Sequence, residues 1–144
     1  MTTGARIRLL LWKAGRAVTR VDRKSIKDTG LGLSDFAIME ALLHKGPLMI
    51  NQIGEKVLLT SGSMTAAINR LEKNGYVKRI KDTEDGRCCY VALTKSGQSV
   101  IEPAYARHEK NLEKVADVLS SEEKVELVRL LKKLGLHANH MELK

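Results

Sequence analysis

The sequence is poor in the residues that separate domains or crosslink small ones. Its 144 residues include only two prolines and two cysteines, with no Gly/Ser tract, no repeat and no long run of like charge. Because no stretch has the composition of a linker, we expect one compact subunit spanning residues 1–144. The cysteines, Cys88 and Cys89, are adjacent in sequence, which excludes a disulfide framework.

Long apolar runs are also absent. A membrane span needs about 20 apolar residues, and the stretch "RIRLLLW" is short and precedes Lys13. No signal peptide is visible, so we expect a cytoplasmic protein with no membrane partner. No cysteine or histidine has a neighbour at zinc spacing, and His44 and His108 lack a partner nucleophile or carboxylate in sequence. We therefore expect no metal, no cofactor and no enzymatic activity.

Charge favours a polyanionic partner. The chain carries 25 Lys and Arg against 17 Asp and Glu, a formal net charge of +8. Charge of this sign suits nucleic acid, although many basic proteins bind nothing specific. The motifs have to decide.

Apolar residues at three- and four-residue steps predict most of the chain to be helical. Arg6 to about Lys27 forms a first amphipathic helix, and Ser34 is a plausible N-cap for a second one that ends at Gly46-Pro47. A short helix follows over residues 51–57, and another begins near Ser61 and ends at Gly75. Two short helices joined by a tight turn indicate a helix-turn-helix.

The helix that begins near Ser61 has two distinct faces. Its buried stripe consists of Met64, Ala67, Ile68 and Leu71, and the opposite face carries small and polar residues that suit a DNA major groove. Hydroxyl groups near the helix start can bind phosphate beside backbone N–H groups. The candidate contacts on this helix are Ser61, Ser63, Thr65, Asn69, Arg70 and Lys73. An ordinary solvated face remains the alternative for Asn69 or Lys73 taken alone.

A change to strand periodicity follows. "YVKRI" and "RCCYVALT" predict a β-hairpin with its turn at Asp85-Gly86, and helix, helix, hairpin is the order of a winged helix. Arg79 lies on the first strand, and Arg87 follows the turn, where an arginine can enter a DNA minor groove. Asp85 either orients Arg87 through a charge-assisted hydrogen bond or simply makes the turn.

Helices return from Lys95 to the C-terminus, with Ser120 and Glu123 spaced as a capping box for a last helix through Leu136. A small winged helix cannot cover the apolar faces of three long helices. The fold class is therefore mainly α with a small β-hairpin wing (α+β), in which the first and last helices pack against a second subunit.

The stretch "LSDFAIMEALLHKGPLMINQIGEKVLLTSGSMTAAINRLEKNGYVKRIKDTEDGRCCYVALTKSG" resembles the MarR family of bacterial transcription regulators. It carries the family's "L…LE…G(L/Y)V.R", its acidic wing "D…D.R" and its closing "LT..G", and the resemblance covers nearly the whole chain. The run "IGEKVLLTSGSMT" is similar to the branch of quinone- and catechol-responsive repressors. Where the family wing commonly has "DRR", Gly86 replaces the first arginine, so one wing contact is missing or taken by a neighbour.

The resemblance implies a homodimer with a winged helix-turn-helix lobe at residues 31–97 and dimerisation helices at 5–30 and 98–144. Two lobes would bind double-stranded DNA at a pseudo-palindromic operator, and a small phenolic or quinone-like effector, or an oxidant, would release it. Carried over to this chain, the family's DNA contacts are the six residues named above, except Lys73, with the wing pair Asp85 and Arg87.

Two further sets of residues have alternative interpretations. Trp12, Phe36 and Met39 could line an effector cavity where the lobe meets the long helices, or could simply be core and dimer packing. Cys88 and Cys89 could be redox-active beside Arg87, or could fill strand positions. The sequence as a whole predicts a DNA-binding transcriptional regulator, more often a repressor in this family. The rival is a winged-helix protein-interaction module without specific DNA binding.

Overall fold

The computed structural model describes residues 1–57, 61–82, 84, 86 and 89–143. Within this part of the chain it has six α-helices and a small antiparallel sheet, so the predicted fold class is confirmed. The elements in chain order are α1 Thr3–Ser25, the 3-10 turn η1 Lys27–Thr29, α2 Leu33–Lys45, β1 Leu48–Met49, α3 Ile50–Val57, α4 Ser61–Lys73, β2 Val77–Lys81, β3 Cys89–Leu93, α5 Lys95–Ala116 and α6 Ser121–His140.

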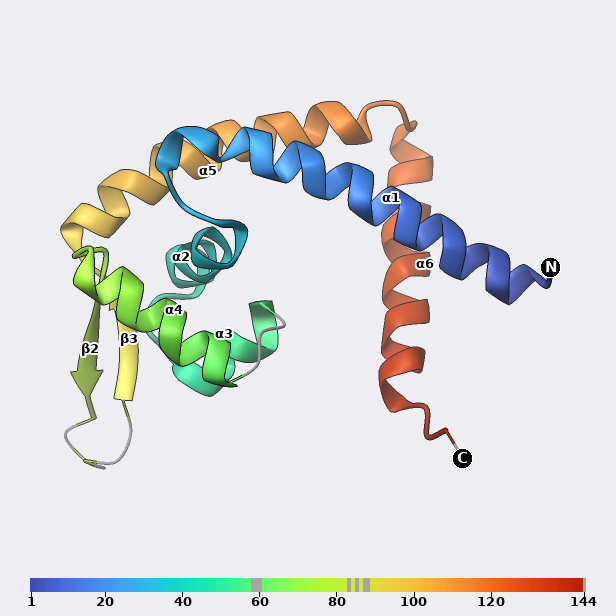
Figure 1. The fold of residues 1–144 in the computed structure, drawn as a ribbon. Helices are drawn as coiled ribbons and strands as arrows, with labels where there is room; N and C mark the ends of the chain where they lie inside the picture. The colour runs from blue at the N-terminus through green and yellow to red at the C-terminus, as the bar shows by residue number, and fades with distance from the viewer. Residues whose placement is uncertain (58–60, 83, 85, 87–88, 144) are drawn as a thin grey trace.

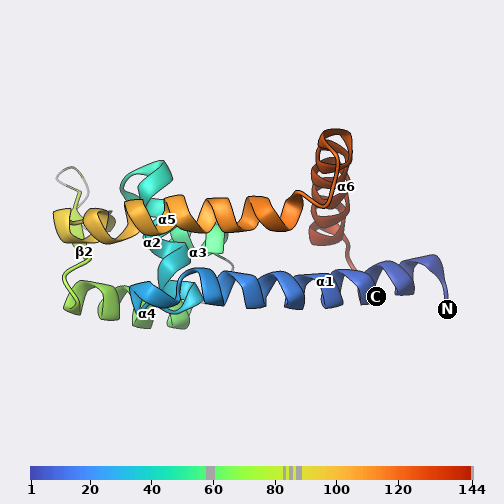
Figure 2. The ribbon, with the colours of Figure 1, turned by 90° about the horizontal axis from the view of Figure 1, so that it is seen from above.

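The chain divides in space into a lobe and a set of long helices (Figure 1). α1 and α5 pack side by side, and the lobe of α2, α3, α4 and the sheet lies beneath one end of the pair. Figure 2 shows α6 turned across the direction of α1 and α5, at the end away from the lobe. None of the helices in the described part of the chain is both long enough and apolar enough to cross a membrane.

The lobe has one hydrophobic core, to which every one of its helices contributes. α4 buries the predicted stripe, α2 buries Phe36, Met39 and Leu42, and α3 buries Ile53. α5 adds Ile101 and Ala104, which fixes the lobe to the long helices. The residues of the α4 stripe are Met64, Ala67, Ile68 and Leu71, each at most 1% exposed.

Helix ends follow the expected chemistry with one exception. Gly46 and Gly75 have positive φ where α2 and α4 end, and the Ser120/Glu123 capping box is present at the start of α6. The prediction that Ser34 is the N-cap of α2 was wrong. Gly32 holds that position with extended backbone and no side-chain cap, because Phe36 N bonds to Gly32 O, which places Ser34 inside the first turn.

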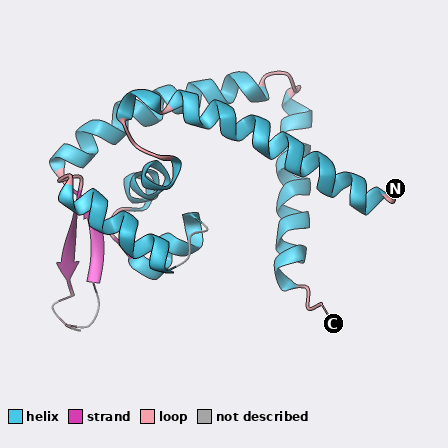
Figure 3. Cartoon of the chain, in the orientation of Figure 1, coloured by secondary structure: helices cyan, strands magenta, loops and turns pink. Residues whose placement is uncertain are grey.

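The sheet has the order β1-β3-β2, and it forms the hairpin edge of the lobe (Figure 3). β2 and β3 pair in register from Val77↔Leu93 to Lys81↔Cys89. β1 was not expected from the sequence. It is two residues long and follows Pro47, so it carries no alternating pattern, and only its pairing with β3 defines it.

A close backbone contact locks the hairpin to α5. Thr94 caps α5 through Gly97 N, and its own N–H bonds to Tyr76 O at 3.0 Å. A Cβ on Gly97 would lie 2.0 Å from that same carbonyl oxygen. Only glycine fits here, and the hairpin therefore has a fixed position relative to the long helix.

Candidate nucleic-acid interface

α4 presents the polar face that the sequence predicted. Thr65, Asn69, Arg70 and Lys73 are exposed on the side away from the buried stripe. Gly62 and Ala66 are exposed on the same helix, and their small size permits close approach of another backbone. Ser63 is also exposed, whereas the side chain of Ser61 lies outside the described atoms.

Arg70 is held by a residue that the sequence did not single out. Its Nη2 donates to Asp35 Oδ1 at 2.8 Å and its Nε to Oδ2 at 3.3 Å. The Asp35 side chain is only 13% exposed, whereas that of Arg70 is 56% exposed. These hydrogen bonds, and the charge of Asp35, raise the pKa of Arg70 above its ordinary value. The fork therefore joins α4 to the start of α2.

Arg79 ties the hairpin to the same helix. It donates to Glu72 Oε1 at 2.7 Å through Nη1 and to Asn69 Oδ1 at 2.8 Å through Nη2. Asn69 uses its amide oxygen as acceptor here, so its contact with a base would be as a donor. Three predicted site residues, Asn69, Arg70 and Arg79, thus also belong to a polar network that orients α4.

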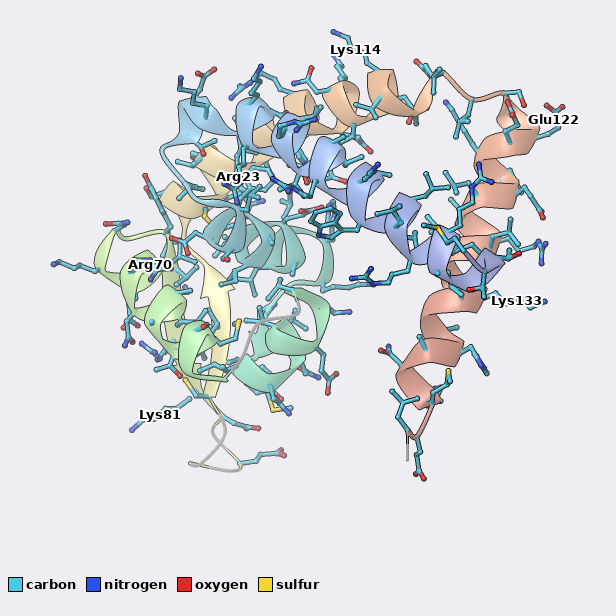
Figure 4. All side chains as sticks on the ribbon, turned by 45° about the vertical axis from the view of Figure 1, so that its right-hand side comes forward. Arg23, Arg70, Lys81, Lys114, Glu122 and Lys133 are labelled. Atoms are coloured by element: carbon cyan, nitrogen blue, oxygen red, sulfur yellow. The ribbon has the colours of Figure 1, made fainter. Side chains whose placement is uncertain are left out.

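Basic side chains continue along one side of the lobe. Lys73 on α4 and Lys78 and Lys81 on β2 are exposed. Figure 4 shows Arg70 and Lys81 on the lobe, away from α6, which carries Glu122 and Lys133. Such a run of cations near a polar helix face is the footprint of phosphate contacts. Of the predicted wing residues, Asp85, Arg87 and Cys88 lie outside the described residues.

Cys89 begins β3 as a half-buried thiol, and its Sγ lies 3.7 Å from Tyr90 O. Among the described residues, no group of three or more His, Cys, Asp or Glu side chains is placed to hold a metal ion. A redox role for either cysteine stays a prediction.

The three predicted effector residues do not share one environment. Phe36 and Met39 are buried in the lobe core, at 2% and 0% exposed. Trp12 is 56% exposed on α1, where the guanidinium of Arg16 lies 5.2 Å from its ring centre. Phe36 also borders a cavity of about 240 Å³ between the lobe and the long helices. The sequence missed the buried His108, which packs edge-to-face on Phe36 with ring centres 5.0 Å apart.

The far ends of α1 and α6 expose an apolar groove of about 620 Å³. The leucines and isoleucine that line it are between 40% and 56% exposed, far more than a stable surface of isolated residues requires. These residues are Ile7, Leu10, Leu11, Leu127, Leu130, Leu131 and Leu134.

Comparison with known proteins agrees with this architecture. Residues 31–89 match the MarR family. Over 129 residues the chain is 36% identical to the HTH-type transcriptional regulator YkoM of Bacillus subtilis (strain 168), covering 88% of this chain and 84% of that protein. It is 32% identical over 130 residues to the HTH-type transcriptional regulator MhqR of the same organism, covering 90% of each.

The fold is also similar to the crystal structure of NadR in complex with 4-hydroxyphenylacetate. The TM-score is 0.80 at 25% identity, covering 93% of this chain and 95% of that one. The polar face of α4, the helix-turn-helix and the hairpin therefore have counterparts in proteins named as regulators of transcription. The chain belongs to the MarR family and is a DNA-binding helix-turn-helix transcriptional regulator.

Proposed function

We propose that the protein is a homodimeric repressor that binds a pseudo-palindromic operator and is released from it by a small molecule or an oxidant. The observation that carries this proposal is the exposed polar face of α4, which Asp35 and Arg79 hold in one orientation. Residues 31–97 act as the DNA-binding lobe, and residues 5–30 and 98–144 supply the dimer helices.

In this arrangement α4 enters the major groove. Ser61, Ser63, Thr65, Asn69, Arg70 and Lys73 face bases and phosphates there. Asp85 and Arg87 keep the minor-groove role expected from the sequence, and Arg79 orients the helix from the hairpin side. Two such lobes have to reach grooves about 34–36 Å apart, or a multiple of that spacing.

A second copy of the chain is the occupant that suits the groove between α1 and α6. The groove is apolar, it involves both ends of the chain, and its leucines are half exposed in the single subunit. A symmetric dimer covers the same surface on both partners. The spacing of the two lobes then depends on how each lobe sits on α1 and α5.

Ligand control is supported by the position of the cavity beside Phe36. It lies where the lobe meets α1 and α5, so an occupant would shift the population of lobe spacings that fit the operator. NadR, whose fold is similar, was crystallised with the small aromatic molecule 4-hydroxyphenylacetate.

The test uses Lys73→Ala, with Lys114→Ala as a matched control. Lys73 is exposed on α4, whereas Lys114 lies on α5 at the opposite side of the molecule from Lys81 (Figure 4). Binding to an operator selected from random DNA is measured at several salt concentrations. Lys73→Ala should reduce the slope of log K against log salt by about 1, and Lys114→Ala should leave it unchanged. Equal slopes for both variants and the parent protein would contradict the assignment of α4.

A further inference from the structure

The cavity beside Phe36 lies where four helices meet. Asp22 comes from α1, Phe36 and Glu40 from α2, Val57 from α3 and His108 from α5. A molecule bound here touches the lobe and the two long helices at once. Its volume of about 240 Å³ exceeds the ~150 Å³ that is enough to hold benzene, so one substituted aromatic ring fits.

His108 is a buried polar side chain with an unmet hydrogen bond. It is 6% exposed, and its Nε2 lies 3.5 Å from Asp22 Oδ1. Its Nδ1 is buried and has no hydrogen-bond partner among the described residues. With the ring proton on Nε2 facing Asp22, Nδ1 is an acceptor, and an acceptor buried without a donor costs free energy. A ligand that brings a donor to this ring recovers that cost.

The charges around the cavity also limit what can enter. Asp22 and Glu40 are both carboxylates, and none of the described lining residues is a lysine or arginine. Burial raises the pKa of Glu40, an effect that His108 and His44 partly offset and Asp22 reinforces. A second negative charge would therefore be repelled and poorly solvated here. The polar groups accept hydrogen bonds, so the site suits an uncharged donor.

The remaining walls favour a flat ring. Leu33, Ala37 and Val57 are apolar, and Phe36 and His108 already meet edge-to-face. Aromatic groups add favourable contacts of this kind beyond the area that they bury. An aliphatic polyol of the same size would leave these walls without a partner.

We propose that this cavity binds an uncharged aromatic diol, such as catechol or hydroquinone, and rejects aromatic carboxylates. One hydroxyl donates to Nδ1 of His108 and the second to the carboxyl of Glu40. Because Nδ1 is shielded from solvent, the imidazole turns about its Cβ–Cγ bond as the ligand enters. The inference rests on the regulatory function proposed above and names the effector class and the residues that select it.

The test is calorimetric titration of the full-length protein with four probes under argon: catechol, hydroquinone, 1,4-dimethoxybenzene and 4-hydroxyphenylacetate. The two diols should bind, and the dimethoxy ring, which has no donor, should bind at least about tenfold more weakly, as expected for one lost hydrogen bond. 4-Hydroxyphenylacetate, which carries a carboxylate, should bind more weakly still.

Variants identify the residues. His108→Leu should weaken diol binding by about tenfold or more, whereas His140→Leu, at the exposed end of α6, should have no effect. Glu40→Gln removes one negative charge, so it should narrow the preference for catechol over 4-hydroxyphenylacetate. The ¹⁵N shifts of the His108 ring give a second readout in the unmodified protein, because a diol that donates to Nδ1 changes that nitrogen's resonance.

Operator binding without ligand separates the two proposals. If the unmodified protein does not bind DNA, the proposed function fails. If it binds DNA but neither diol binds, or diol binding survives His108→Leu with an unchanged His108 spectrum, the cavity assignment is overturned while the proposed function stands. Tighter binding of 4-hydroxyphenylacetate than of catechol would likewise overturn it.

Discussion

Arg70 of α4 and Asp35 of α2 form a forked ion pair, with Nη2 to Oδ1 at 2.8 Å and Nε to Oδ2 at 3.3 Å. The carboxylate is nearly buried and the guanidinium is more than half exposed. A guanidinium has five N–H donors, and this pair uses two of them. Arg70 can therefore hold α4 against α2 and donate to DNA at the same time.

Removing Arg70 alone should cost more than removing the whole pair. Arg70→Ala leaves Asp35 as a buried carboxylate without its partner, so the melting temperature should fall. The double variant with Asp35→Asn should recover part of that loss, because no buried charge remains unpaired. Thermal unfolding of the four proteins in a double-mutant cycle measures the difference.

Asp35→Asn also separates positioning from contact. It keeps the charge of Arg70 but weakens the fork, so operator affinity should fall by about tenfold, equal to about 1.4 kcal/mol, with an unchanged salt slope. A normal operator affinity for Asp35→Asn would show that the fork stabilises the fold without orienting α4.

The helical periodicity was sufficient to predict the core of the lobe and the exposed face of α4. Met64, Ala67 and Leu71 repeat at steps that only one side of a helix satisfies, and all three are buried. Gly75 likewise adopts the left-handed conformation expected at a helix end. These are local signals, which depend on neighbours within one or two turns.

The polar network could not be predicted in the same way. Asp35 and Arg70 are separated by 35 positions, and nothing near either residue indicates the other. The burial of His108 against Phe36 depends on how α5 packs on α2, and β1 exists only through its pairing with β3. Each of these features arises from tertiary packing, which leaves no periodic trace in the sequence.

Glu72 should act as a brake on DNA binding. Its carboxylate accepts from Arg79 beside the exposed face of α4, where it repels phosphate. Glu72→Gln should therefore raise operator affinity and increase the salt slope by about 1, because Arg79 becomes available for one more phosphate contact. Filter binding across a salt series gives both quantities.

Glu126→Gln is the matched control for this variant. Glu126 also pairs with an arginine, Arg129, through two hydrogen bonds, but it lies on α6. Its loss should change neither affinity nor slope. If both glutamine variants raise affinity equally, the effect is one of net charge and not of position.

Leu131→Glu should dissociate the dimer. Leu131 is 43% exposed in the groove between α1 and α6, and a carboxylate buried there without a partner is strongly unfavourable. Sedimentation at micromolar concentration should show a monomer, and operator binding should weaken because each half-site is then bound separately. Val118→Glu, at a position 86% exposed between α5 and α6, should leave the dimer intact. Two variants that sediment alike would place the interface elsewhere.

The stability of the protein should depend on pH through Glu40. Burial raises the pKa of this carboxyl above its ordinary value, so the folded protein binds a proton more tightly at this site than the unfolded chain does. Below the unfolded pKa, both states are protonated and the site adds no penalty. As the pH rises through the folded pKa, the carboxylate forms in a poorly solvated place, and stability is lost.

Glu40→Gln should remove this loss, since glutamine stays neutral. Its melting temperature should exceed that of the parent protein at pH 7 to 8, and the difference should shrink toward zero near pH 4, as the sign of a raised acid pKa requires. Glu109→Gln, on the exposed side of α5, provides the control for loss of a negative charge. A difference that grows as the pH falls would mean that the Glu40 carboxylate is stabilised in the folded state by His44 and His108 more than burial disfavours it.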